Sequence, residues 1–330
     1  LQLLHDPPGP FETVRVVVNT WPTSRWLGEQ LALELGGIAA NLRFPFLTSE
    51  LRQTVDGLLG EGAAGSDPWR ATELVWPLLE LLPALAAGPD AALLARWLEQ
   101  RGHGQRPALD LPLWQLGRAI ADSFDDLSLY RPAMVAAWCH GYDQDARGQP
   151  LPADQLWQPR LFRQLHDRLG RPPFGLKVLT AIERLRGGTA CLDRLQGPLR
   201  LFGLSSAAPV QVHLLQALAS VVPVDLYLLT PCRDLWQRCS DRRRSLDVAI
   251  ELADPHDLDW LARTPGLEAR FGRLGGEFQQ LLEGTGDSQL AAEETRDLFL
   301  LPASAAEHQG LRPPTLLEQL QQQLVETDAW

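Results

Sequence analysis

The chain has 330 residues, which is long enough for two or three domains with hydrophobic cores of their own. Its formal net charge of −11 argues against a protein that coats DNA with a broadly basic surface. Its hydrophobic content of 45% is ordinary for a globular protein, and no apolar run approaches the ~20 residues that a membrane-spanning helix needs. The four cysteines lack C-x-x-C spacing, which argues against a zinc ribbon and favours free thiols in a reducing cytoplasm.

The amino-terminal segment has the strand–turn–helix pattern of a parallel α/β sheet. Residues 14–19 form a β-branched apolar run, which predicts a buried strand. A polar turn follows, and Thr23 or Ser24 is expected to cap a helix that ends near Leu35 and carries an apolar face. A further helix is predicted over about 48–59, with Thr or Ser as its cap.

The long middle of the chain is almost entirely helical in pattern. From residue 67 to about 187, apolar residues recur at i, i+3 and i+4, and strand signals are absent. Pro and Gly interrupt this pattern at intervals. Six helices are therefore expected, near 68–86, 89–101, 111–128, 132–140, 155–169 and 175–186.

Strand signals return after the helical block, at 199–204 and 224–229, with a helix between them. The sequence therefore predicts an α/β fold interrupted by a helical insertion. We expect a discontinuous α/β domain formed by 1–64 and 190–330, and an inserted helical domain at 65–189.

The last hundred residues carry a weaker pattern. A helix is predicted near 265–283, a strand at 297–301 and a final helix at 315–325. Because the chain begins with Leu1 rather than Met and this last helix runs almost to Trp330, we expect a fragment of a longer protein.

The chain lacks the motif that cradles nucleotide phosphates. No G-x-x-x-x-G-K-[ST] follows any predicted strand. Lys177, the only lysine, lies in FGLKVL without the glycines of a phosphate-binding loop upstream. We therefore expect no catalysis by this fragment, and no cofactor or metal.

Several sequence blocks occur together in the order and spacing of one family. They are GGIAANLRFPF, FDDLSLYRPAMVAAW, LFGLSSAAPVQVHLLQAL, LYLLTPCRDLW and ARFGRLGGEFQQLL. Over nearly its whole length the chain resembles the amino-terminal third of the exodeoxyribonuclease V gamma chain (RecC) family. The IAAN-x-x-FP and TPCRDLW blocks are the most specific.

The resemblance implies a degenerate superfamily 1 helicase-like (P-loop-type) sheet domain that has lost its ATPase motifs. Where an active helicase has acidic residues for Mg²⁺ after a strand, this chain has 203–206, Gly-Leu-Ser-Ser. The resemblance further implies a non-catalytic subunit of a RecBCD-type enzyme that guides the 3′-ended strand and scans it for Chi in recombinational repair. Its partners would be DNA, as a single-stranded 3′ tail and duplex fork, and RecB-like and RecD-like subunits in the cytoplasm, with no membrane.

Two alternatives stay open at this point. One is a purely structural assembly module whose residues never touch DNA. The other is an ATP-dependent helicase or nuclease subunit, which the missing phosphate-binding lysine opposes.

Candidate DNA contacts follow from the resemblance and from strand-end positions. The turn from Asn19 to Trp21 follows the first strand, where ligands of parallel sheets bind. Trp21 either stacks on a base or packs on the following helix. Phe46 and Arg52 match channel-lining positions of the family. A core position for Phe46 is slightly favoured, and Arg52 is alternatively a solvated helix residue.

A second candidate set lies in the helical block. Asp122 and Asp126 are spaced i, i+4 on one helix face, with Asp125 between them. The resemblance implies that this stretch lines the strand-scanning tunnel, where carboxylates accept hydrogen bonds from base amino groups. The alternative is a solvated helix end. Arg131 either contacts DNA or simply precedes a proline that starts the next helix. Lys177 is placed by the resemblance on a further tunnel helix.

Overall fold

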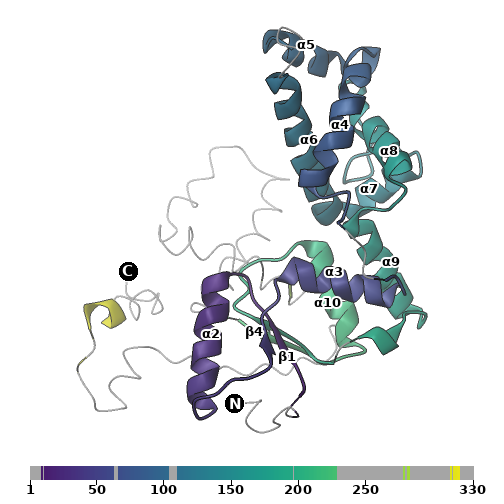
Figure 1. The fold of residues 1–330 in the computed structure, drawn as a ribbon. Coiled ribbons are helices and arrows are strands. Elements are labelled where there is room, and N and C mark those ends of the chain that lie inside the picture. The colour runs from purple at the N-terminus through teal and green to yellow at the C-terminus, as the bar shows by residue number, and fades with distance from the viewer. Residues whose placement is uncertain are drawn as a thin grey trace, which may run out of the picture. The chain divides into compact units, whose positions relative to one another are not determined.

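The chain forms two compact units (Figure 1). The structure, a computed structural model, describes residues 11–62, 66–103, 110–195 and 197–228, with the short pieces 9, 278, 281–282, 313 and 315–319. Unit 1 comprises Leu1–Leu47, Pro198–Ala207 and Pro223–Trp330, and unit 2 comprises Thr48–Gly197 and Ala208–Val222. The strand predicted at 297–301 lies outside the described residues, as do most of the helices predicted at 265–283 and 315–325. The predicted domain boundaries stay a prediction.

The described residues of unit 1 form a four-stranded parallel sheet in the order β2-β1-β3-β4. Its strands are β1 (Val14–Val17), β2 (Leu42–Arg43), β3 (Leu199–Phe202) and β4 (Val224–Tyr227). The central strands β1 and β3 pair through Val16 with Arg200 and Val17 with Leu201. The predicted α/β class with a parallel sheet is confirmed, whereas the two-residue strand β2 was missed because it is too short to show a period.

Helix α2 (Trp21–Glu34) packs on this sheet through Leu27, which shares a core cluster with Val14 and Val16 of β1 (Figure 1). The predicted cap at Thr23 or Ser24 is wrong, because Thr20 caps the helix and accepts the Thr23 N–H at 3.3 Å. A proline in the first helical turn favours this earlier start. The apolar face expected for this helix is only partly buried, since Trp26 is 53% exposed.

Unit 2 is built mainly from helices. They are α3 (Leu47–Leu58), α4 (Ala71–Ala86), α5 (Ala92–Gln100), α6 (Leu111–Tyr130), α7 (Pro132–Cys139), α8 (Trp157–Leu169), α9 (Phe174–Arg186) and α10 (Pro209–Ala219). Short 3-10 turns η1 (Pro89–Ala91), η2 (Ala153–Gln155) and η3 (Leu192–Arg194) accompany them. The six helices expected between 67 and 187 are confirmed with ends shifted by a few residues.

Aromatic side chains form the centre of the helical core. Trp69 stacks on Phe162 with ring centroids 4.7 Å apart, and Trp138 meets Phe162 edge to face at 5.8 Å. Both indole N–H groups donate to backbone carbonyls, that of Trp69 to Arg171 at 2.7 Å and that of Trp138 to Gln144 at 2.8 Å. The buried rings therefore leave no indole donor unsatisfied, which burial of tryptophan requires.

Close backbone packing fixes the start of α9. Gly175 is buried, and a Cβ atom built on it would overlap the backbone carbonyl of Ser128 near the end of α6. It would also lie 3.4 Å from the Cβ of Pro132. Only glycine therefore allows this approach, since a backbone carbonyl cannot move aside as a flexible side chain can.

Gly175→Ala is therefore expected to lower the free energy of unfolding by about 2–3 kcal/mol through overpacking. Urea denaturation of the chain measures this change. Gly62→Ala is the matched control, because a Cβ there meets nothing within 4 Å. Equal stability of the two variants would show that α6 and α9 are not packed as described.

Candidate nucleic-acid interface

The four strands described in unit 1 have their carboxyl ends at one edge of the sheet, because the strands are parallel. The strand order changes direction between β1 and β3, since β2 lies on one side of β1 and β3 on the other. Ligands of open α/β sheets bind outside such a point. Here it is bordered by the turn from Asn19 to Trp21 after β1 and by 203–206 after β3.

Trp21 and Phe46 form an exposed aromatic pair at this edge. Trp21, the first residue of α2, is 74% exposed, and Phe46 is 37% exposed. A parallel bridge between Val18 and Phe46 places Phe46 beside the end of β1. The two rings meet edge to face with centroids 5.8 Å apart. The core position favoured for Phe46 is therefore wrong, and the ring of Trp21 is largely exposed and meets Phe46.

The first turn of α2 has little capacity to bind an anion. Pro22 has no N–H, the N–H of Thr23 donates to the side chain of Thr20, and that of Ser24 donates to the Thr20 carbonyl at 3.2 Å. Asn19 is also engaged locally, since its Oδ1 accepts the Thr23 hydroxyl at 3.4 Å. Helix N-termini bind phosphate through free backbone N–H groups, and this turn offers few.

The turn after β3 is equally short of phosphate or metal ligands. Gly203 has φ of 65°, a left-handed conformation that favours glycine, and its N–H donates to the Tyr227 carbonyl at 2.9 Å. Ser205 and Ser206 follow and are exposed. The turn brings hydroxyl groups to the edge of the sheet, and no carboxylate occurs within 203–206.

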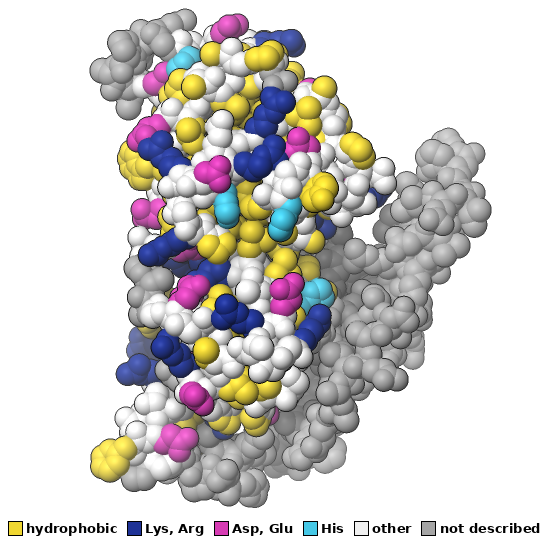
Figure 2. Space-filling model, turned by 90° about the vertical axis from the view of Figure 1, so that its right-hand side faces the viewer, with side chains coloured by type: hydrophobic (Ala, Val, Ile, Leu, Met, Phe, Trp, Pro, Cys, Tyr) yellow, Lys and Arg dark blue, Asp and Glu magenta, His cyan; other side chains and the backbone are white. Residues whose placement is uncertain are grey.

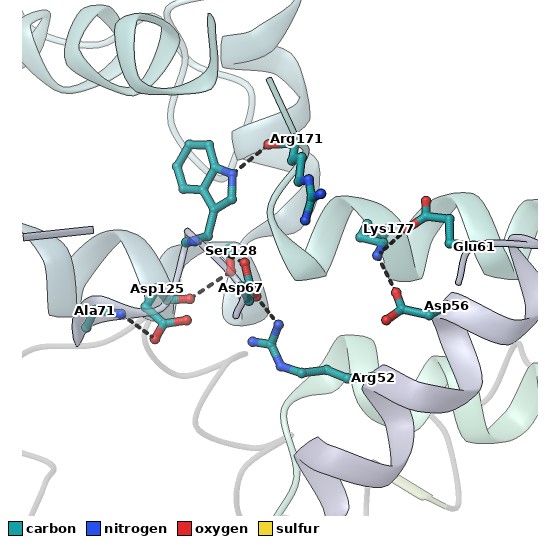
Figure 3. A network of polar contacts seen from close by, with 10 residues as sticks. Arg52, Asp56, Glu61, Asp67, Ala71, Asp125, Ser128, Arg171 and Lys177 are labelled. Carbon is teal, nitrogen blue, oxygen red and sulfur yellow. Dashed lines mark hydrogen bonds and ion pairs between the residues drawn. The ribbon is translucent and has the colours of Figure 1, made fainter. Parts of the chain in front are cut away.

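Arg52 lies on α3 in an internal polar network of unit 2 (Figure 3). Its guanidinium group pairs with Asp67 and lies 4.4 Å from the ring centroid of Phe174. Only 18% of its side chain is exposed, so the solvated alternative for Arg52 is wrong. A paired and stacked guanidinium is well suited to hold α3 against α9.

Lys177 joins two carboxylates from segments far away in the sequence (Figure 3). Its ammonium group pairs with Asp56 on α3 and lies 2.7 Å from Glu61 Oε2, and 15% of its side chain is exposed. Burial lowers the pKa of Lys177, but the hydrogen bonds and negative charges of Asp56 and Glu61 outweigh burial and raise it above its ordinary value. The amine is therefore held in its charged form.

The three aspartates of α6 have three different environments. Asp125 accepts the Ala71 N–H at the start of α4 at 3.2 Å, and so caps that helix from a neighbouring one. Burial raises the pKa of Asp125, and the Ala71 hydrogen bond and the charge of Arg52 only partly oppose it. Asp122 pairs with Arg118 on the same helix at 2.9 Å, whereas Asp126 is exposed.

Arg131 is exposed and lies between α6 and α7, directly before a proline at the first position of α7. The predicted helix start at this proline is therefore confirmed.

The candidate residues are divided between the two units. Asn19, Trp21 and Phe46 belong to unit 1, whereas the other six candidates belong to unit 2. Figure 2 shows basic and acidic side chains interspersed over the described surface of one face, an arrangement that differs from a continuous basic surface.

Several important partners were missed by the sequence analysis. Asp67 and Asp56 neutralise cations that lie 15 and 121 residues away, and no local pattern joins such pairs. The role of Thr20 as the cap of α2 was detectable, because a threonine two residues before a proline is typical of a helix start.

None of the helices in the described part of the chain combines the length and hydropathy that crossing a lipid bilayer requires.

The fold and its carboxyl edge define a parallel α/β protein with exposed aromatic side chains where this class binds ligands. The family model of the RecC N-terminal domain matches residues 1–327. The chain therefore belongs to the RecC family.

Curated relatives agree with this membership. The RecBCD enzyme subunit RecC of Escherichia coli K12 is 28% identical over 344 residues, which cover 97% of this chain and 28% of the relative. That of Mycobacterium tuberculosis H37Rv is 33% identical over 251 residues, covering 71% and 21%. That of Mycolicibacterium smegmatis is 31% identical over 286 residues, covering 85% and 24%. The chain thus spans about a quarter of the length of these relatives.

Lys177→Gln is expected to lower the free energy of unfolding at pH 8 by about 1–3 kcal/mol, because two carboxylates lose their charged partner. The pKa of Lys177 is higher in the folded protein than in the unfolded chain. Its ion pairs therefore stabilise the folded state fully below the unfolded-state pKa, and this stabilisation is lost as pH rises through the folded-state pKa. Urea denaturation at pH 8 and pH 11 should therefore show a smaller difference between wild type and variant at pH 11.

Arg25→Gln is the control for this experiment, because it breaks an exposed pair with Glu29. It should change stability little at either pH. A Lys177→Gln effect as small as that of the control would contradict the role assigned to this ion pair.

Proposed function

We propose that this chain is the amino-terminal part of a non-catalytic subunit of a RecBCD-type helicase–nuclease. In this proposal the subunit binds DNA, guides the 3′-ended single strand and scans it for Chi during recombinational repair. Membership of the RecC family and the printed name of the relatives, RecBCD enzyme subunit RecC, support it. Its partners are then RecB-like and RecD-like subunits in the cytoplasm.

The proposal includes a degenerate helicase-like α/β domain, formed by 1–64 and 190–330, with a helical insertion at 65–189. The parallel sheet of unit 1 is compatible with this origin. The first turn of α2 takes the place of a phosphate-binding turn after a buried strand, yet its N–H groups are largely engaged or missing. Lys177 is already neutralised by two carboxylates. Both features favour an inactive ATPase.

The exposed pair of Trp21 and Phe46 is the observation that supports strand binding most directly. Every base has a π-face, so stacking on aromatic rings binds single strands with little sequence preference. An exposed pair of large aromatic rings at the ligand edge of a parallel sheet suits this use. Arg52 and Lys177 then act mainly by holding α3 and α9 together, because their charges are engaged within unit 2.

Trp21→Ala in the full-length subunit, assembled with its partner subunits, should weaken binding of a duplex with a 3′ single-stranded tail. Loss of one stacked base costs about 1–3 kcal/mol, or roughly 5- to 150-fold in affinity. Phe46→Ala should act in the same direction, with a smaller effect because its ring is less exposed. Fluorescence anisotropy of the labelled tail measures both.

Trp76→Ala is the matched control, because Trp76 is also largely exposed but lies on α4 of the other unit. It should leave affinity for the tail unchanged. If Trp21→Ala and Phe46→Ala bind the tail like the control, strand guidance by this edge is refuted and the assembly-module alternative is favoured.

The ATP-dependent alternative has its own test. Photolabelling of the assembled enzyme with 8-azido-ATP should modify a partner subunit and leave this subunit unlabelled, because its α2 turn offers few phosphate contacts. Peptide mapping by mass spectrometry identifies the labelled sites. A specific adduct at residues 19–24, suppressed by unlabelled ATP, would contradict the inactive-ATPase proposal.

A further inference from the structure

The carboxyl edge of the sheet in unit 1 is almost uncharged within the residues that the structure describes. It is formed by the segments in which the four described strands end, 18–26, 44–47, 202–207 and 227–228. Arg25 is the single charged residue of these segments, and its Nε lies 3.3 Å from Glu29 Oε1 on the next turn of α2. These segments therefore offer a phosphate one cation, which is already paired.

The backbone at this edge adds little for a phosphate. The N–H groups of Thr23 and Ser24 are used within the first turn of α2, and that of Gly203 donates to the Tyr227 carbonyl at 2.9 Å. In a parallel α/β fold the start of the helix after a central strand is the usual place for a bound phosphate. Here that place has neither the charge nor the donors to hold one.

Aromatic rings gather at this edge, from every described strand. Trp21 follows β1 and meets Phe46, which follows β2. Phe202 and Tyr227 are the last residues of β3 and β4, with ring centroids 6.5 Å apart, and Trp26 lies 6.1 Å from Phe202. Trp21 and Trp26 are largely exposed, whereas Phe202 and Tyr227 are partly buried. Two groups of rings, each with an exposed indole, therefore lie near the strand ends.

Short polar side chains complete this surface. Asn19, Ser205 and Ser206 are exposed, whereas the aliphatic side chains of Val18 and Leu204 beside them are buried. Flat rings next to amide and hydroxyl groups match nucleobases, which have a π-face for stacking and hydrogen-bonding groups along their edges. A docked peptide segment is favoured instead by pockets for its large apolar anchors. The side chains at this edge therefore favour bases over a peptide.

We propose that this edge binds the bases of a single strand and makes no contact with its phosphates. One base stacks on the indole of Trp21 beside Phe46, and another stacks on the indole of Trp26. The inference rests on the proposed function, because it assigns the chemistry by which this edge guides the strand. Bases inside a duplex are already stacked, so the edge acts only on unwound DNA. Its contribution to affinity is independent of salt, because no counterions are released.

The test measures binding of a duplex with a 3′ tail to the full-length subunit assembled with its partner subunits, by fluorescence anisotropy. Each tail position in turn carries either an abasic residue, which keeps the phosphate, or a methylphosphonate, which keeps the base and removes the charge. At one position the abasic residue should lower the affinity of the wild type roughly 5- to 150-fold, and Trp21→Ala should then lower it no further. Methylphosphonates should leave the effect of Trp21→Ala unchanged.

Trp26→Leu should show the same coupling to an abasic residue at a different tail position, because Trp26 belongs to the second group of rings. Leucine keeps an apolar side chain against Phe202, and circular dichroism checks that the variant is folded. Trp21→Ala should also lower affinity by the same factor at about 50 mM and about 200 mM salt, since stacking releases no counterions.

Arg25→Gln is the matched control, because it removes the one charge that lies between the two indoles in the sequence. It should leave unchanged both the affinity and the slope of log K against log salt concentration. Loss of a phosphate contact would instead reduce the size of that slope by about 1.

Three outcomes overturn the inference alone. One is coupling of Trp21 to a methylphosphonate, or to neither substitution, although Trp21→Ala weakens tail binding. Another is a slope reduced by about 1 in Arg25→Gln, which would show a phosphate contact at this edge. The third is loss of co-elution with the partner subunits in Trp21→Ala, which would show a docked partner segment instead of bases. If Trp21→Ala co-elutes and binds every tail like the wild type, strand guidance by this edge fails, and the inference fails with it.

Discussion

Parallel alignment of the four strands is the constraint on which the candidate interface depends. Parallel strands require crossover connections, so the described strands of unit 1 all end at the same edge of the sheet. Trp21 and Phe46 meet there only because the end of β1 pairs with the segment after β2 through Val18. A shift of that pairing by one residue would turn Phe46 to the other face. The aromatic pair is therefore a product of strand register.

The helical unit uses its charged groups in a different way. Arg52 and Lys177, which look available in the sequence, are both neutralised by carboxylates and bind segments of the same unit together. Asp125 similarly serves the backbone of a neighbouring helix. Asp126 and Arg131, by contrast, are exposed at the surface of this unit. Internal pairing thus decides which charges are available for recognition.

Secondary structure was largely predictable because it follows local periodicity. The six helices of the middle segment have apolar residues at helical spacing and are separated by Pro and Gly, so their existence needed no tertiary information. The start of α2 was placed too late, because several hydroxyl residues compete to cap it and only the backbone conformation of Thr20 decides between them. The strand β2 is too short to show any period, and the exposure of Phe46 depends on pairing rather than on its own hydrophobicity.

The sequence by itself determined the class of fold, the positions of most helices and the family, because periodicity and motif order are properties of neighbouring residues. It also determined that no lysine follows a phosphate-binding glycine loop. Only the tertiary structure decided that Lys177 is held by Asp56 and Glu61, and that Gly175 admits the Ser128 carbonyl. Those contacts join residues far apart in the chain, so their partners are chosen by packing rather than by local pattern.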